Sequence, residues 1–227
     1  MRRFSGLSRV AIAAALVAAS LGGVGAGRLS AADAKEEGFV PLFNGRDLAG
    51  WEGATKGYVA QDGRIVCKKA GGGNLWTVKE FADFHLTFEF LLTPGANNGL
   101  GIRMAPKAHA AYQAMELQIL DNTAEKYAKL KPYQYHGSVY GVVPAKRGHL
   151  KKVGEWNRQE VIARQGRIQV ILNGTTIVDA DVWKIDPAKT MDGRPHPGLH
   201  NKKGRIGFLG HGAHVEFRNI RIKELTE

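Results

Sequence analysis

The chain is poor in cysteine, because Cys67 is the one thiol among 227 residues. A single thiol cannot form a disulfide within the chain, so side-chain packing must supply the stability of the fold. Long hydrophobic runs are also scarce: the apolar stretch at residues 10–21 is shorter than the roughly 20 residues that a membrane-spanning helix needs. Zinc-ligand spacings, phosphate-binding glycine loops and the Gly-x-Ser-x-Gly signature are missing, so nothing points to nucleotide or serine-hydrolase chemistry.

The first residues carry the pattern of an export signal. Three arginines, Arg2, Arg3 and Arg9, precede an apolar centre at residues 10–19. Small residues suited to cleavage follow at residues 30–34. We therefore expect residues 1–34 to be a cleaved signal peptide and residues 35–227 to form one domain, in the periplasm or outside the cell. A signal retained as a membrane anchor is the alternative, whereas no stable membrane span is expected after cleavage.

Lysine and arginine outnumber aspartate and glutamate by 32 to 21, which gives a formal charge of +11. Cleavage after Ala32 removes four arginines and no acid, and so lowers this charge to +7. The remaining basic residues concentrate in three separate loop-like segments, and no nucleic-acid-binding motif accompanies them. We expect a basic solvated surface and no nucleic-acid partner.

Apolar and polar residues alternate through most of the chain beyond the signal, whereas helical periodicity is nearly absent. Around His85, Thr87 and Glu89 the intervening residues are phenylalanine and leucine, a pattern typical of a strand with one face in a core. The expected strands span residues 58–60, 64–68, 74–77, 84–92, 99–104, 114–120, 137–142, 160–164, 167–172, 176–181, 205–209 and 215–223. Short strands separated by glycine, proline and asparagine predict an all-β fold, a two-sheet antiparallel sandwich of the jelly-roll type.

Two long segments, residues 121–136 and 183–203, show no strand pattern. Loops of this length are more often functional than neutral. Both segments are therefore expected to form the rim of a site.

The most informative segment is residues 115–122, most of which belong to the expected strand 114–120. Glu116 and Gln118 project from one face of this strand, and apolar residues occupy the other face. If the apolar face packs in the core, the polar face lines an outer, concave surface; a merely solvated outer face is the alternative. Asp121 stands at an odd offset from Glu116, so only a bulge or the end of the strand could bring the two carboxylates to one side.

Other polar residues offer weaker indications. Arg103, on the expected strand 99–104, could clamp a carboxylate or sugar hydroxyls, although a lone arginine on a strand is more often an ion-pair partner. His211 and His214 flank a turn before the last strand, where metal binding is the less common role of such a pair.

A series of short motifs follows one order along nearly the whole chain beyond the signal, from about residue 39 to residue 225. The motifs are Phe43-Asn44-Gly45-Arg46-Asp47-Leu48, Asn97-Asn98-Gly99 followed by Arg103, Glu116-Leu117-Gln118-Ile119-Leu120-Asp121, Gly137-Ser138-Val139-Tyr140-Gly141, Gly154-Glu155-Trp156-Asn157, Leu172-Asn173-Gly174 and His211-Gly212. Each motif is weak, but the ordered set is specific. In this set the chain resembles the domain family once called DUF1080, the 3-keto-disaccharide hydrolase family.

The resemblance implies a concanavalin A-like, glucanase-type sandwich whose polar strand faces form a sugar site. It also implies cleavage of 3-keto-glycosides or 3-keto-disaccharides by abstraction of the C2 proton, elimination and hydration. The residues implied for catalysis are Glu116 as the base, with Asp121 or His211 as an acid or orienting a metal. The residues implied for substrate binding are Arg103, Gln118, Tyr140, His136 and Asn98, the last standing where the family usually has serine. A divalent cation that polarises the ketone would suit this chemistry.

Two other functions are compatible with the same sequence. A non-catalytic carbohydrate-binding module would share the fold and use the same polar and aromatic side chains. A hydrolase of unoxidised glucans is less compatible, because Gln118 stands where the matching strand of jelly-roll glucanases carries a second acid. In each case a carbohydrate is the expected partner.

Overall fold

The structure is a computed structural model that describes residues 38–105 and 110–226. The chain divides into two units, Met1–Lys35 and Glu36–Glu227, and the described residues all belong to the second. The predicted signal peptide at residues 1–34 lies outside them, so export stays a prediction. Within the described ranges, no helix has the length and apolar character needed to cross a membrane.

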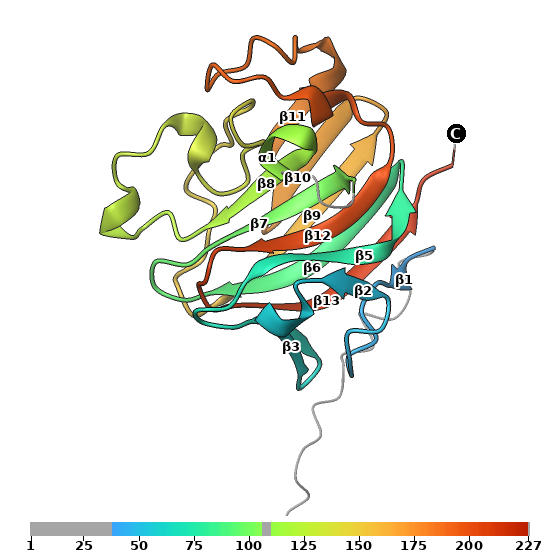
Figure 1. Cartoon of the computed structure of the whole chain (residues 1–227). Helices are drawn as coiled ribbons and strands as arrows, with labels where there is room; N and C mark the ends of the chain where they lie inside the picture. The colour runs from blue at the N-terminus through green and yellow to red at the C-terminus, as the bar shows by residue number, and fades with distance from the viewer. Residues whose placement is uncertain (1–37, 106–109, 227) are drawn as a thin grey trace, which may run out of the picture. The chain divides into compact units, whose positions relative to one another are not determined.

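Two antiparallel sheets make up the fold, which confirms the predicted all-β sandwich (Figure 1). Sheet A contains eight strands of the described chain. In spatial order they are β11 (Thr175–Asp181), β10 (Arg167–Leu172), β9 (Trp156–Arg164), β6 (Phe84–Leu92), β13 (Val215–Glu224), β4 (Arg64–Cys67) and β3 (Tyr58–Gln61), with β1 (Val40–Pro41) paired to β13.

Sheet B contains five strands of the described residues. Their order is β2 (Trp51–Gly53), β5 (Gly73–Phe81), β12 (Gly204–Gly210), β7 (Asn97–Met104) and β8 (Met115–Leu120). Helical structure is limited to α1 (Ala110–Gln113) and the 3-10 turns η2 (Thr55–Gly57), η3 (Glu125–Tyr127), η4 (Pro132–Gln134), η5 (Val182–Lys184) and η6 (Pro197–His200), again counting only what the structure describes. The sequence had indicated neither α1 nor the short strands β1 and β2.

Aromatic rings from both sheets fill the space between them. Phe208 of β12 stacks on Phe217 of β13, with ring centroids 3.7 Å apart, and Trp51 stacks on Phe208, with ring centroids 5.6 Å apart. Phe88 of β6 packs against both phenylalanines. The alternation predicted for β6 is confirmed, since its phenylalanines and Leu86 are buried. Burial of these rings supplies the stability that a chain with one cysteine cannot take from disulfides.

Residues 137–142 do not form a regular strand, so the strand predicted there is wrong. Gly137 and Gly141 have φ angles of 82° and 76°, left-handed values that interrupt an extended chain. Between them the backbone still pairs with the edge of β8: Tyr140 N donates to Glu116 O over 2.9 Å, and Gly137 N donates to Gln118 O over 2.8 Å. This short pairing covers the edge of sheet B and brings Tyr140 beside Glu116.

Both predicted rim segments lie toward the β8 side of sheet B, away from β1, β2 and β3 (Figure 1). The helix α1, which precedes β8, contacts β8 and η6. The segment 183–203 is therefore linked through α1 to the β8 edge of sheet B.

Candidate active site

A cleft with a volume of about 220 Å³ lies on the outer face of sheet B, over β7 and β8. Its floor comes from the strands: Asn97, Glu116, Gln118 and Leu120. Its walls come from α1, from residues 121–143 and from the turn after β12: Ala111, Tyr112, Tyr127, Leu130, Gln134, Tyr140 and His211. Of the eight residues predicted for the site, the structure brings four together here, namely Glu116, Gln118, Tyr140 and His211.

Glu116 is the one carboxylate among the described residues that line the cleft. Its side chain is 7% exposed, and burial raises its pKa to about 7. Gly99 on the neighbouring strand makes room for it, because a Cβ at Gly99 would lie 2.2 Å from Glu116 Oε1. A carboxylate that packs against the backbone of a glycine and has a pKa near neutrality is suited to accept and release a proton.

Two amide oxygens on the cleft floor lack a hydrogen-bond partner in the protein. They are Oε1 of Gln118, whose residue is 6% exposed, and Oδ1 of Asn97 on the adjacent strand. An unpaired buried acceptor costs about 1–3 kcal/mol, a cost that a bound hydroxyl donor would offset. Both oxygens are themselves buried, so a hydroxyl donor in the cleft would reach them only if their side chains shift.

Tyr140 is oriented as a donor toward the cleft. Gln134 Nε2 donates to its hydroxyl oxygen over 3.0 Å, which leaves the phenolic proton available to an acceptor in the cleft. His211 reaches the cleft from the β12–β13 turn and is exposed. Glu116, Tyr140 and His211 thus offer proton-transfer groups from three separate segments.

Arg103 does not line the cleft, so its position gives no support to the expectation that it clamps a substrate there. Its φ of 52° interrupts the regular strand after Ile102, and its side chain is fully buried. The guanidinium donates to the carbonyls of Ala82 (3.0 Å) and Gln165 (2.7 Å) and to Asp83 Oδ1 (3.0 Å). These bonds make Arg103 a structural link between strands.

Asp121 is also away from the cleft, as its odd offset from Glu116 indicated, and its predicted role as the acid is not supported by its position. Its two oxygens accept hydrogen bonds from Gly95 N at 2.8 Å and from Thr123 N and Oγ1 at 2.9 and 2.6 Å. Burial opposes ionisation, but bonds from Thr123, Gly95 and Ala124 outweigh it and lower the pKa of Asp121. Asp121 fixes the turn at the end of β8.

His136 and Asn98 point inward, and the prediction that they contact substrate is corrected as well. The His136 ring stacks on Phe90 at 5.0 Å, its Nδ1 accepts from Leu120 N, and burial lowers its pKa to about 3. Asn98 is fully buried, and its Oδ1 accepts from Leu209 N over 3.1 Å. Both side chains lie on the core side of the polypeptide that forms the cleft.

Several lining residues were missed from the sequence. Asn97 could have been found, because the apolar residues Leu100 and Ile102 place the even-numbered side of β7 in the core and Asn97 on the other face. Tyr112, Tyr127 and Gln134 had no such signal, since they come from a four-residue helix and two 3-10 turns.

The cleft does not supply a complete set of metal ligands. Among the described lining residues, only Glu116 and His211 are of the His, Cys, Asp or Glu types that commonly bind metal ions. The described ranges contain no group of three such side chains able to hold an ion. The described residues therefore give no support to the divalent cation that the family resemblance suggested, and we derive no step through a metal.

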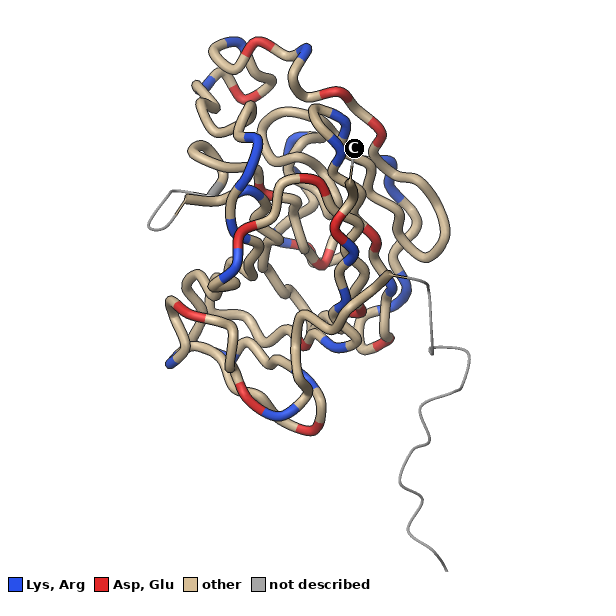
Figure 2. Tube along the Cα trace, turned by 90° about the vertical axis from the view of Figure 1, so that its right-hand side faces the viewer, with Lys and Arg blue, Asp and Glu red and all other residues tan. Residues whose placement is uncertain are grey.

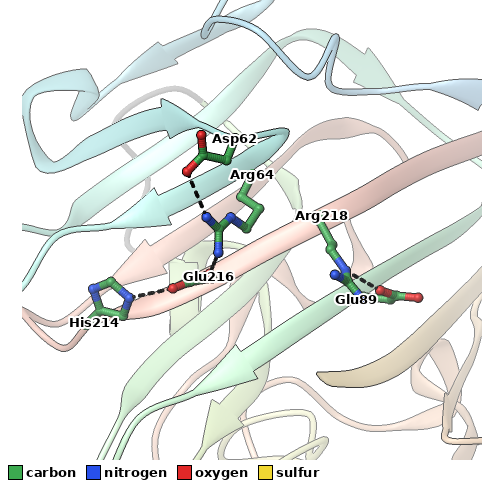
Figure 3. A network of polar contacts seen from close by, with 6 residues as sticks. All are labelled: Asp62, Arg64, Glu89, His214, Glu216 and Arg218. Carbon is green, nitrogen blue, oxygen red and sulfur yellow. Dashed lines mark hydrogen bonds and ion pairs between the residues drawn. The ribbon is translucent and has the colours of Figure 1, made fainter. Parts of the chain in front are cut away.

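The outer face of sheet A differs from the cleft in that its charges are paired. Figure 3 shows Arg64 between Asp62 and Glu216, at 3.0 and 2.8 Å, and Arg218 against Glu89 at 2.6 Å. In Figure 2 the basic residues alternate with acidic ones along the trace and form no continuous basic stripe in that view. This arrangement gives no support to a nucleic-acid site.

Comparisons with known proteins agree with the fold. The sequence profile of the 3-keto-alpha-glucoside-1,2-lyase-like domain matches residues 38–223. The 3-keto-disaccharide hydrolase of Bacteroides thetaiotaomicron is 27% identical over 230 residues, which cover 83% of this chain and 79% of that protein.

Two crystal structures from Parabacteroides distasonis ATCC 8503, both of candidate glycosyl hydrolases, are similar along the same part of the chain. One is 30% identical with a TM-score of 0.75 and covers 83% of this chain and 100% of its own. The other is 26% identical with a TM-score of 0.72 and covers 83% and 95%. Since the profile spans most of the chain and these relatives share its sandwich, the chain belongs to the 3-keto-alpha-glucoside-1,2-lyase-like domain family and is an enzyme of the glycoside hydrolase type.

Proposed function

We propose that this enzyme cleaves 3-keto-glycosides in the cleft over β7 and β8, with Glu116 as the general base. The observation that carries the proposal is a single buried carboxylate, with its pKa raised to about 7, on a floor of unpaired amide acceptors. The 3-keto-disaccharide hydrolase among the relatives supports the choice of substrate.

The chemistry requires one base and few other groups. A carbonyl at C3 of the sugar acidifies the hydrogen on C2, so a carboxylate can take that proton and leave an enolate. The enolate then reforms the ketone as the C1–O bond breaks, which gives a C1=C2 double bond and an aglycone oxygen that takes up a proton. Water adds at C1 and a proton returns to C2, so the net reaction is hydrolysis.

The lining residues match these demands. Glu116 accepts the C2 proton and, once protonated, can return it. Tyr140 provides a phenolic donor for the enolate oxygen or the leaving oxygen, and His211 is the second proton donor at the cleft. Gln118 and Asn97 accept hydrogen bonds from sugar hydroxyls once their side chains shift, because their amide oxygens have no partner in the protein.

The direct test compares a 4-nitrophenyl 3-keto-glucoside with its unoxidised parent, in both anomers. We expect nitrophenol release, above the uncatalysed rate, from the keto compound alone. Binding without release would instead identify a carbohydrate-binding module, and release from the parent would identify an ordinary glycosidase. A retaining glycosidase needs two carboxyls about 5 Å apart, whereas Glu116 is the one carboxylate of the described lining.

Gly99→Ala is expected to lower kcat/KM by about 10- to 100-fold without unfolding the protein, because its Cβ would displace the Glu116 carboxylate. Steady-state kinetics on the keto-glycoside and thermal unfolding would be measured side by side. Gly101→Ala on the same strand is the matched control, since its Cβ meets the flexible thioether of Met104 instead. Equal activity of the Gly99 and Gly101 variants would count against the position assigned to the base.

A further inference from the structure

A positively charged side chain, Arg194, lies beside the cleft and contacts one of its lining residues. Arg194 NH1 donates a hydrogen bond of 2.9 Å to the hydroxyl of Tyr112, a residue that lines the cleft. Tyr112 belongs to α1, immediately before β8, so the guanidinium stands at the Tyr112 end of the cleft and not over the catalytic floor.

The backbone that presents Arg194 is fixed by its own hydrogen bonds. Arg194 N donates to Asp192 Oδ1 over 3.0 Å, and Thr190 Oγ1 donates to Arg194 O over 2.6 Å. Asp192 also pairs with the buried His196, whose Nε2 is 3.2 Å from each carboxylate oxygen, and the His196 ring packs edge-on against Tyr112 at 5.0 Å. The segment and the cleft wall therefore form one packed unit that holds the arginine in place.

This guanidinium has no acidic partner within the part of the chain that the structure describes, where no ion pair joins Arg194 to a carboxylate. Asp192, the nearest acid along the sequence, already accepts bonds from Thr190, from Arg194 N and from His196. Arg194 is exposed and uses one of its donors on Tyr112. Its remaining planar donors suit a carboxylate, which arginine binds through two parallel hydrogen bonds.

We infer that Arg194 forms an anion subsite at the Tyr112 end of the cleft, which takes a carboxylate carried by the substrate. This inference rests on the proposed function, since it takes the cleft to hold a glycoside. The carboxylate belongs either to a uronic acid in the sugar or to an acidic aglycone.

Binding to the Glu116→Gln variant tests the subsite without turnover. Phenyl glucoside is the neutral reference, 4-carboxyphenyl glucoside places the carboxylate on the aglycone, and phenyl glucuronide places it on the sugar. We expect one of the two acids to bind about tenfold more tightly than the reference by calorimetry, with an advantage that shrinks as salt is raised. The acid that binds more tightly shows whether the carboxylate belongs to the sugar or to the aglycone.

Added to this background, Arg194→Gln is expected to remove the preference for the acid, and Arg194→Lys to keep only part of it. Lys126→Gln is the matched control: it removes the same charge near the opposite end of the cleft, where Lys126 Nζ lies 4.7 Å from the centroid of Tyr127. We expect this control to keep the preference. The inference is overturned if neither acid binds more tightly than the reference. It is also overturned if Lys126→Gln and Arg194→Gln lose the preference equally.

The two proposals fail in different ways. If the wild-type enzyme turns over a 3-keto-glycoside while the acids show no advantage, only the subsite is wrong. If an acid binds through Arg194 while no keto-glycoside is turned over, the catalytic proposal is wrong and the anion subsite stands.

Discussion

Glu116→Gln should lower kcat/KM for a 3-keto-glycoside by about 10²- to 10⁴-fold, the usual contribution of a positioned general base. Glutamine keeps the size and a hydrogen-bonding oxygen but cannot accept the C2 proton. In the wild-type enzyme, kcat/KM should fall about tenfold per pH unit below pH 7, because the base must be ionised and its pKa is about 7. Initial rates between pH 5 and pH 9 measure both effects.

The same substitution should stabilise the folded protein at alkaline pH. Burial raises the pKa of Glu116 from 4.5 to about 7, so the folded state holds this proton more tightly than the unfolded state. The cost of ionising the buried Glu116 is absent below about pH 4.5, grows as the pH rises toward 7, and is then complete at about 3 kcal/mol. Urea unfolding should show Glu116→Gln more stable than wild type at pH 8 and nearly equal at pH 4.5.

The control for Glu116 is Glu125→Gln, which removes the same charge from an exposed residue of η3. It should change neither the rate nor the pH dependence of stability. If Glu116→Gln retained full activity, the base would have to be another group of the cleft.

Replacement of Arg103 by methionine should lower the free energy of unfolding by about 3–4 kcal/mol. The substitution removes a fully buried guanidinium, leaves the carbonyls of Ala82 and Gln165 without this donor, and takes the cationic partner from Asp83, which keeps the hydrogen bond from Gln165 N. Loss of one partner of a buried ion pair is strongly destabilising, because the remaining groups stay desolvated. Chemical denaturation at pH 7 measures this loss.

Arg46→Met is the matched control for Arg103, since Arg46 is exposed in the loop before β2, and it should change stability by less than about 0.5 kcal/mol. Arg103→Lys separates the structural role from the earlier expectation of a substrate clamp. A structural Arg103 predicts loss of stability with little change in KM. A stable Arg103→Lys variant with a raised KM would show that the residue contacts substrate after all.

Part of the cleft could be predicted from the alternation of side chains along each strand alone. In β8, Leu117 and Ile119 identify the face that packs in the core, and this places Glu116 and Gln118 on the opposite face. The same rule applied to β7 places Asn98 inward and Asn97 outward, so the substrate contact expected at Asn98 contradicted the pattern.

Residues at the ends of regular structure could not be placed in this way. Arg103 follows the last residue of β7 that pairs with β8, and its positive φ turns the side chain into a buried network that no periodicity describes. Asp121 directly follows β8, and the donors to its carboxylate are Gly95 and residues 123–124. In both cases partners distant in sequence or in a turn fix the direction of the side chain.

The sequence by itself determined the all-β sandwich, the family and the polar face of β8, because alternation and ordered motifs depend on neighbours along the chain. Only the tertiary structure decided which polar residues share a cleft. Tyr112, Tyr140 and His211 reach it from three separate segments, and the raised pKa of Glu116 comes from its burial in the packed chain. Desolvation and long-range contacts are properties of the packed chain, which is why a pattern of strands could locate the floor of the site but not its walls.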